Sequence, residues 1–243
     1  MNSQLELDIQ ELADAGGADF YGIADLQSVQ SIIATDFSEM TAGYPRAIVF
    51  GITLMNTIVD QIIHQEDRSV LLAYRHHAYD VVNLRLDNIA SRMGSMLQAN
   101  GWRAYPVPAR VTFDNERQYS IFSHKMAARL AGLGWIGKNC LLITPQNGPR
   151  VRWASVLTNA PLEASREPLP NRCGTCRQCV EICPVNAIMG RQFDLEEPRQ
   201  VRLDAFKCNA HQKSMEAKHG MPVNCGLCLF VCPYGRESSY SSN

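Results

Sequence analysis

The chain has 243 residues, of which 46% are hydrophobic and 19% are charged, and its formal net charge is -1. This size and composition predict a globular protein of one or two domains with a full hydrophobic core, and they exclude a disordered chain. A net charge near zero gives no general attraction for nucleic acid. No apolar run long enough for a membrane span occurs, and the N-terminus lacks a basic-then-apolar pattern and a twin-arginine pair. We therefore expect a soluble cytoplasmic protein without an export signal or a membrane partner.

The first half of the chain predicts both helices and strands. Apolar residues recur at helical spacing from Leu5 to Ala13, and short strands are expected at 20–24 and 46–54. The longest helix candidate runs from about Val70 to Gln98 and has an apolar stripe on one face. Residues 102–108 contain two prolines, so we expect them to be extended at a sheet edge or in a loop.

The second half begins with a short predicted helix, roughly Tyr119 to Ala131, that would stop at a glycine. A glycine-rich stretch follows, and strands are expected at 141–144 and 153–158. Residues 161–170 contain three prolines and several charges, a pattern typical of a linker.

Eight of the nine cysteines form two related runs near the C-terminus. The first run is Cys173, Cys176, Cys179 and Cys183, and the second run is Cys208, Cys225, Cys228 and Cys232. The first run reads C-x2-C-x2-C-x3-C-P, the run of two-cluster bacterial ferredoxins, in which the fourth cysteine ligates the other cluster. By this pattern Cys232 completes the first 4Fe-4S cluster and Cys183 completes the second. The first set is therefore Cys173, Cys176, Cys179 and Cys232, and the second set is Cys183, Cys208, Cys225 and Cys228. Zinc and disulfides are the alternatives, but the three-cysteine run and both Cys-Pro endings favour clusters.

A glycine-rich stretch at residues 131–139 reads Ala-Gly-Leu-Gly-Trp-Ile-Gly-Lys-Asn. Its three glycines predict a strip of bare backbone that can approach a planar or phosphate-bearing ligand, and Lys138 can meet an anion. The spacing fits neither a P-loop nor a dinucleotide-binding fingerprint. A structural turn is the alternative interpretation.

This stretch, with the Leu-Leu-Ile that follows, resembles the signature of the cobalamin-dependent epoxyqueuosine reductases. The continuation through Gly148-Pro-Arg-Val-Arg152 looks like the reductive dehalogenases. In both families the segment lies immediately before the same cysteine arrangement, and the resemblance covers about residues 120–235. It implies an α+β fold. A nitroreductase-like α/β corrinoid-binding core would occupy residues 1–165, and a bacterial-ferredoxin-like double 4Fe-4S domain would occupy residues 166–243.

The resemblance also implies a function. Electrons would pass from an external donor of the ferredoxin or flavodoxin type, through the two clusters, to a bound cobalamin that reduces a small-molecule substrate. An electron-transfer protein that reduces the corrinoid of a partner protein is the alternative, and a docking module without corrinoid is a third reading. The residues implied to line the corrinoid are Gly132, Leu133, Gly134, Trp135, Ile136, Gly137, Lys138, Asn139, Arg150 and Arg152.

Two departures from the epoxyqueuosine reductases affect the predicted chemistry. Gln118 stands where those enzymes carry a proton-donating aspartate, and the chain lacks their C-terminal helical-repeat region, so transfer RNA is not an expected partner. The remaining candidate proton donors are His124, which could titrate near neutral pH, and Tyr119, beside the basic Lys125. The alternative is that His124 only hydrogen-bonds the corrinoid or caps the helix. Cys140, the ninth cysteine, is expected to be a buried structural thiol.

Overall fold

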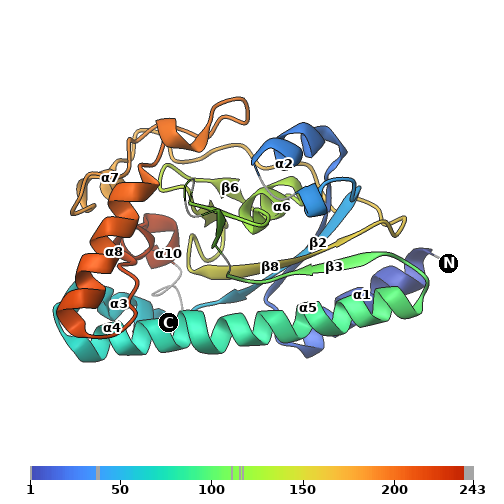
Figure 1. Ribbon diagram of the computed structural model, residues 1–243, viewed down its shortest axis with the longest axis horizontal. Helices are drawn as coiled ribbons and strands as arrows, with labels where there is room; N and C mark the ends of the chain where they lie inside the picture. The colour runs from blue at the N-terminus through green and yellow to red at the C-terminus, as the bar shows by residue number, and fades with distance from the viewer. Residues whose placement is uncertain (1, 37–38, 111, 115, 117, 238–243) are drawn as a thin grey trace. The chain divides into compact units, whose positions relative to one another are not determined.

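The computed structural model describes residues 2–36, 39–110, 112–114, 116 and 118–237 (Figure 1). It has mixed α and β structure and divides into two compact units. Unit 1 comprises Met1–Thr53, Val81–Leu133 and Arg152–Leu169, and unit 2 comprises Leu54–Asp80, Gly134–Val151 and Pro170–Asn243. These units interleave along the chain, whereas the predicted domains are consecutive. The assignment of corrinoid and cluster binding to residues 1–165 and 166–243 stays a prediction.

A four-stranded sheet forms the centre of unit 1, with the strand order β1-β2-β8-β3. The strands are β1 (Phe20–Asp25), β2 (Arg46–Thr53), β3 (Ala104–Val107) and β8 (Val151–Thr158). β1 pairs with β2 and β3 pairs with β8, both in antiparallel register. The central strands β2 and β8 are buried along most of their length, as continuous apolar runs predict. β3 lies at the edge, where Pro106 is tolerated, and this confirms the expectation for the proline-containing segment.

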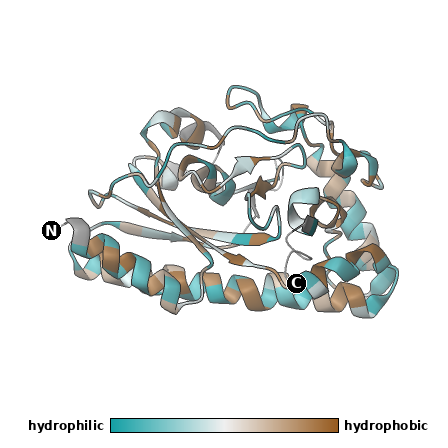
Figure 2. Ribbon diagram, turned by 180° about the vertical axis from the view of Figure 1, so that it is seen from behind, coloured by the Kyte–Doolittle hydropathy of each residue, from teal (hydrophilic) through white to brown (hydrophobic). Residues whose placement is uncertain are grey.

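Helices cover both faces of this sheet. α1 (Asn2–Ala15) and α5 (Val82–Ala99) lie on one face, and α6 (His124–Leu130) lies on the other (Figure 1). Hydrophobic and hydrophilic residues alternate along α5 in Figure 2, as an amphipathic helix requires. Its inward side chains, Leu86, Ile89, Met93 and Leu97, are at most 2% exposed. The predicted N-terminal helix and apolar stripe are therefore confirmed.

The predicted long helix has an interruption that the hydrophobic pattern does not reveal. α4 (Arg68–Arg75), a π-helical turn (His76–Val81) and α5 follow one another without a break. The helix ends at Asn100, and Gly101 has a φ of 82°, a left-handed conformation that glycine adopts without strain. Single π-helical turns within longer helices occur frequently at functional sites.

The expected helix from Tyr119 to Ala131 is wrong in its first turn. Tyr119–Ser120 form the short strand β5, which pairs with β4 (Thr112–Asp114). α6 begins only at His124, because the Ser123 hydroxyl accepts a hydrogen bond from the Met126 amide at 3.2 Å and caps the helix. Gln118 has a φ of 54°, which a helix does not contain.

The proline-rich segment 161–170 contains no helix or strand, as predicted, but it is attached to the sheet. The Ile23 amide donates to the Ser165 hydroxyl at 2.8 Å, and the Ser165 amide donates to the Ile23 carbonyl at 2.9 Å. The Arg46 guanidinium donates to the Leu162 carbonyl at 2.8 Å. The segment is therefore an ordered extension along β1 and not a free linker.

Unit 2 consists mainly of short helices and loops. Its elements are α3 (Asn56–Asp60), α4, β6 (Trp135–Ile136), β7 (Leu142–Ile143), α7 (Gln178–Glu181), α8 (Ala205–His219), α9 (Leu227–Phe230) and α10 (Pro233–Glu237). The longest, α8, is capped by Asp204, whose carboxylate accepts from the Lys207 amide, and it ends at Gly220 with a φ of 66°. α2 (Gln30–Asp36) belongs to unit 1. In the part of the chain that is described, no helix has the length and apolar character needed to cross a membrane.

We expect substitution of Gly94 to destabilise unit 1. A Cβ atom at Gly94 would lie 2.6 Å from the ring of Pro106, where α5 packs on β3. Gly94→Leu should therefore lower the free energy of unfolding by about 1–3 kcal/mol, because overpacking forces backbone shifts. Asn88→Leu, at an exposed position of α5, is the control and should change it by less than about 0.5 kcal/mol. Urea unfolding measures both, and an unchanged stability for Gly94→Leu would contradict this packing.

Candidate functional site

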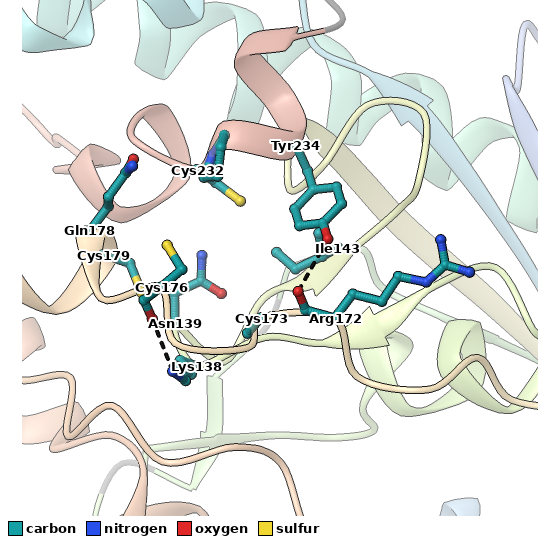
Figure 3. A pocket seen from close by; sticks show the side chains of 11 residues that line it. Lys138, Asn139, Ile143, Arg172, Cys173, Cys176, Gln178, Cys179, Cys232 and Tyr234 are labelled. Carbon is teal, nitrogen blue, oxygen red and sulfur yellow. Dashed lines mark hydrogen bonds between the residues drawn. The ribbon is translucent and has the colours of Figure 1, made fainter.

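Four cysteines line a cavity of about 300 Å³ in unit 2 (Figure 3). They are Cys173, Cys176 and Cys179, which lie before and within α7, and Cys232, which precedes α10. This is the set that the crossed ligation scheme brings together. Among the described residues, no three His, Cys, Asp or Glu side chains converge closely enough to hold a single metal ion.

The second set of cysteines is brought together by the same scheme. Burial raises the pKa of the Cys208, Cys225 and Cys228 thiols, and Cys183 adds to the shift at each of them. Burial likewise raises the pKa of Cys232 to about 12, and there the neighbouring thiols that add to it are Cys173 and Cys179. The last cysteine of each run, Cys183 or Cys232, therefore interacts with thiols of the other run.

Loss of hydration disfavours the charged form of these thiols, and repulsion between neighbouring thiolates adds to that effect. An iron cluster would supply the positive charge that keeps coordinating thiols deprotonated. The sulfur donors and their number fit two 4Fe-4S clusters.

Hydrogen bonds reach the sulfur atoms of the second set. The Ala187 amide donates to Cys183 Sγ at 3.3 Å, and Gln212 Nε2 lies 3.7 Å from Cys208 Sγ. The Asn224 amide holds Gln212 in turn, because its Nδ2 donates to Gln212 Oε1 at 2.9 Å. Such contacts tune the potential of a cluster. Sequence reasoning missed Gln212, although its place four residues after Cys208 on one helix puts both on the same face.

Two residues of the glycine-rich stretch hold the cysteine loops. Lys138 is only 6% exposed, and its Nζ donates to the carbonyl oxygens of Gly174 at 2.7 Å and Cys176 at 2.9 Å. Asn139 Nδ2 donates to the Cys228 carbonyl at 3.0 Å. The two side chains therefore support one loop from each cysteine set. This contact with protein carbonyls differs from the predicted contact of Lys138 with an anion.

The glycines of the stretch are required by close packing within the protein. A Cβ atom at Gly134 would overlap the carbonyl of Ile143 in β7, and one at Gly137 would lie 2.8 Å from the Ile143 side chain. The structural alternative is therefore sufficient to explain both glycines. Gly132 and Leu133 belong to unit 1, and Trp135 and Ile136 are buried in unit 2. A role of this backbone in lining a corrinoid stays a prediction.

The two arginines predicted to meet a corrinoid already have protein partners. Arg150 is fully buried in unit 2, where it donates to Asn56 Oδ1 at 2.9 Å and forms an ion pair with Asp60 at 2.7 Å. Arg152 belongs to unit 1, and its Nε donates to Asn83 Oδ1 at 3.1 Å. Both guanidinium groups therefore have polar partners within their own unit.

The candidate proton donors lie in unit 1, where His124 is held at both ring nitrogens. Nε2 lies 3.0 Å from the Pro108 carbonyl and Nδ1 lies 3.0 Å from the Ser155 hydroxyl. A carbonyl only accepts, so Nε2 carries the proton and Nδ1 accepts from Ser155. Loss of hydration lowers the pKa of His124 to about 4, and Arg152 contributes. This corrects the expectation that His124 titrates near neutral pH.

The other predicted positions are also placed. Tyr119 is 6% exposed in β5, next to Gln118 at its left-handed turn, and a catalytic role for Tyr119 stays a prediction. Cys140 is buried, as expected for a structural thiol. Sequence reasoning missed Tyr234, which follows the second Cys-Pro pair and lines the cavity. Its hydroxyl donates to the Arg172 carbonyl at 3.1 Å (Figure 3). Its ring packs edge-on against Trp135.

Sequence comparisons agree with this site. The family described as a 4Fe-4S double cluster binding domain matches residues 172–235, which contain all eight cysteines. Epoxyqueuosine reductase of Gloeobacter violaceus is 40% identical over 121 residues, which cover 45% of this chain and 35% of that protein. Epoxyqueuosine reductase of Pseudomonas aeruginosa is 24% identical over 246 residues, which cover 95% of this chain and 62% of that protein. The chain thus spans less than two thirds of the length of these relatives.

Solved structures show the same fold. Epoxyqueuosine reductase bound to an epoxyqueuosine-modified tRNA stem loop superposes with a TM-score of 0.62 at 16% identity, over 98% of this chain and 67% of that chain. A reductive dehalogenase studied for B12-dependent dehalogenation superposes with a TM-score of 0.66 at 23% identity, over 96% of this chain and 33% of that chain. The chain therefore resembles the epoxyqueuosine reductases in sequence, shares the fold of a reductive dehalogenase and carries a double 4Fe-4S domain.

Proposed function

We propose that this protein is an iron–sulfur reductase that depends on cobalamin and acts on a small-molecule substrate. The observation that carries the proposal is the cavity that Cys173, Cys176, Cys179 and Cys232 line together in unit 2, the grouping that the crossed scheme requires. The 40% identity with an epoxyqueuosine reductase supports the reductase class, and the reductive dehalogenase studied for B12-dependent dehalogenation supports the cofactor. The specific substrate is left open by both similarities.

In this proposal the protein residues hold and separate the redox groups. Each crossed set would bind one 4Fe-4S cluster, and the bound corrinoid would supply the cobalt centre that reduces the substrate. Lys138 and Asn139 fix the loops that carry Cys176 and Cys228, so the two cluster sites keep a constant geometry. The external donor would be a ferredoxin-type or flavodoxin-type protein. In this proposal residues 132–139 would line the corrinoid, as the family resemblance implies.

A second candidate is an electron-transfer protein that reduces the corrinoid of a partner protein. It is favoured by Gln118, which stands in place of the aspartate of the epoxyqueuosine reductases and is not an acid. It is also favoured by His124, whose ring nitrogens already bind Pro108 and Ser155. Turnover of a small oxidised substrate without any added protein would exclude it.

Paired cysteine substitutions test the crossed ligation. In the crossed scheme Cys173→Ala with Cys232→Ala damages only the first cluster, so reconstituted protein should keep about four of about eight irons. Cys225→Ala with Cys232→Ala damages both clusters and should leave few irons. Iron and sulfide analysis of the two double variants decides the question. If each run of consecutive cysteines bound its own cluster, the pattern would be reversed, because Cys225 and Cys232 would then share a cluster.

Corrinoid binding is tested by an anaerobic titration of the reconstituted protein with cob(II)alamin. We expect stoichiometric binding with a perturbed cob(II) spectrum, followed by visible absorption and EPR. The same titration of Gly134→Val is the comparison, since its side chain would displace β7 from the glycine-rich stretch and weaken binding. A protein with about eight irons and no corrinoid binding would contradict the proposal.

The lowered pKa of His124, caused mainly by its loss of hydration, predicts a pH dependence of stability. Its pKa is lowered to about 4 in the folded protein from about 6.5 in the unfolded chain, so the unfolded chain binds the extra proton between these values. Stability should therefore be full above about pH 6.5 and fall by up to about 3 kcal/mol as the pH drops toward 4. Urea unfolding of wild-type protein and His124→Gln at pH 7 and pH 5 measures this. Equal pH dependence in both proteins would show that His124 contributes nothing to it.

A further inference from the structure

Lys138 is a buried cation without a carboxylate partner. Three cationic side chains are less than 9% exposed among the residues that the structure describes, and all three belong to unit 2: Lys138, Arg150 and Arg202. Arg150 pairs with Asp60 at 2.7 Å, and Arg202 lies 3.9 Å from a carboxylate oxygen of Glu197. The described contacts of the Lys138 ammonium are the carbonyl oxygens of Gly174 and Cys176. A buried charge of this kind needs a compensating charge nearby.

The compensating charge is available in the cavity that Lys138 itself lines. Figure 3 shows its side chain beside the loop that carries Cys176 and Cys179. A 4Fe-4S cluster with four thiolate ligands is anionic and becomes more negative on reduction. A fixed positive charge beside it therefore stabilises the reduced form more than the oxidised form.

The second cysteine set has different surroundings. Its described sulfur contacts are neutral: the Ala187 amide at Cys183 and the Gln212 side chain at Cys208. Amide donors also favour a reduced cluster, but they carry no net charge. Arg202 is the buried cation closest in sequence to Cys208. It already pairs with the Glu197 carboxylate and donates to the carbonyls of Asp194 and Glu197.

We propose that Lys138 is the counter-charge of the first cluster, and that it raises the reduction potential of this cluster above that of the second. Its two hydrogen bonds position the ammonium on the loop that carries the cysteines. The difference in potential favours transfer of an electron from the second cluster to the first. The inference rests on the proposed function only in requiring that both crossed cysteine sets hold clusters.

A redox titration followed by EPR tests this with the reconstituted full chain. Wild-type protein should show two one-electron midpoints. Lys138→Met should lower the higher midpoint by about 59 mV or more, equivalent to a tenfold smaller equilibrium constant for reduction, and leave the lower midpoint unchanged. Lys138→Arg should preserve both midpoints. Lys218→Met, which removes an exposed lysine of α8, is the matched control and should change neither.

Two further variants assign the midpoint that moves. Cys208→Ala leaves only the first set complete, and its remaining midpoint should fall when Lys138→Met is added. Cys173→Ala leaves only the second set complete, and its midpoint should not change. A shift confined to the Cys173→Ala background would overturn the assignment of Lys138 to the first cluster.

Lys138→Gln separates charge from hydrogen bonding, because its amide donates to carbonyls without a positive charge. Unchanged midpoints in both Lys138→Met and Lys138→Gln, with about eight irons bound, would overturn the inference. Loss of one cluster in these two variants but not in Lys138→Arg supports it, whereas loss in Lys138→Arg as well contradicts it. Wild-type protein that fails to bind about eight irons would instead contradict the proposed function, and with it the inference.

Discussion

The gathering of eight partly buried thiols in unit 2 is the constraint on which the rest of that unit depends. Thiolates in such a place repel one another and lose hydration, so their charge must be offset from several directions. The loops that carry them are held by side chains from the glycine-rich stretch, Lys138 and Asn139. The close packing of Gly134 on β7 allows that stretch to lie where these side chains reach the loops.

Unit 1 is stabilised by its central sheet and by polar contacts within the unit. Its sheet buries two central apolar strands, and His124 is held within the unit by Pro108 and Ser155. Arg152 is held in the same way by Asn83. These polar contacts stabilise one arrangement of the chain, because each broken bond would leave a buried group unpaired. The reactive thiols and the buried cations are concentrated in unit 2.

Local patterns predicted the elements whose cause is local. Helical spacing identified α1 and α5, and the two prolines placed β3 at an edge. The cysteine spacing predicted a crossed grouping, and Cys173, Cys176, Cys179 and Cys232 line one cavity, whereas the ligation itself stays a prediction. The start of α6 was predicted too early, because it depends on the cap Ser123 and not on the residues before it. The interleaving of the two units could not be predicted, because the amino-acid composition does not change at their boundaries.

The partners of single side chains were beyond prediction for a related reason. Lys138 binds carbonyl oxygens 36 and 38 residues later in the chain, and His124 binds Ser155, 31 residues later. Backbone carbonyls carry no sequence signal, so the type of residue indicated a charge at position 138 but not what it would meet. The glycines were predicted as bare backbone for a ligand, although packing on β7 alone requires two of them.

The crossed arrangement has a consequence for biosynthesis. A ribosome adds residues from the N-terminus, so Cys225 and Cys228 emerge before Cys232, the cysteine that closes the first set. A nascent chain that has not yet reached Cys225 holds neither set complete, although five of the eight thiols have already been made. Neither cluster can therefore have all four of its ligands until the C-terminal cysteines have been synthesised. A premature stop between Cys228 and Cys232 would spare the ligands of the second site and remove one from the first.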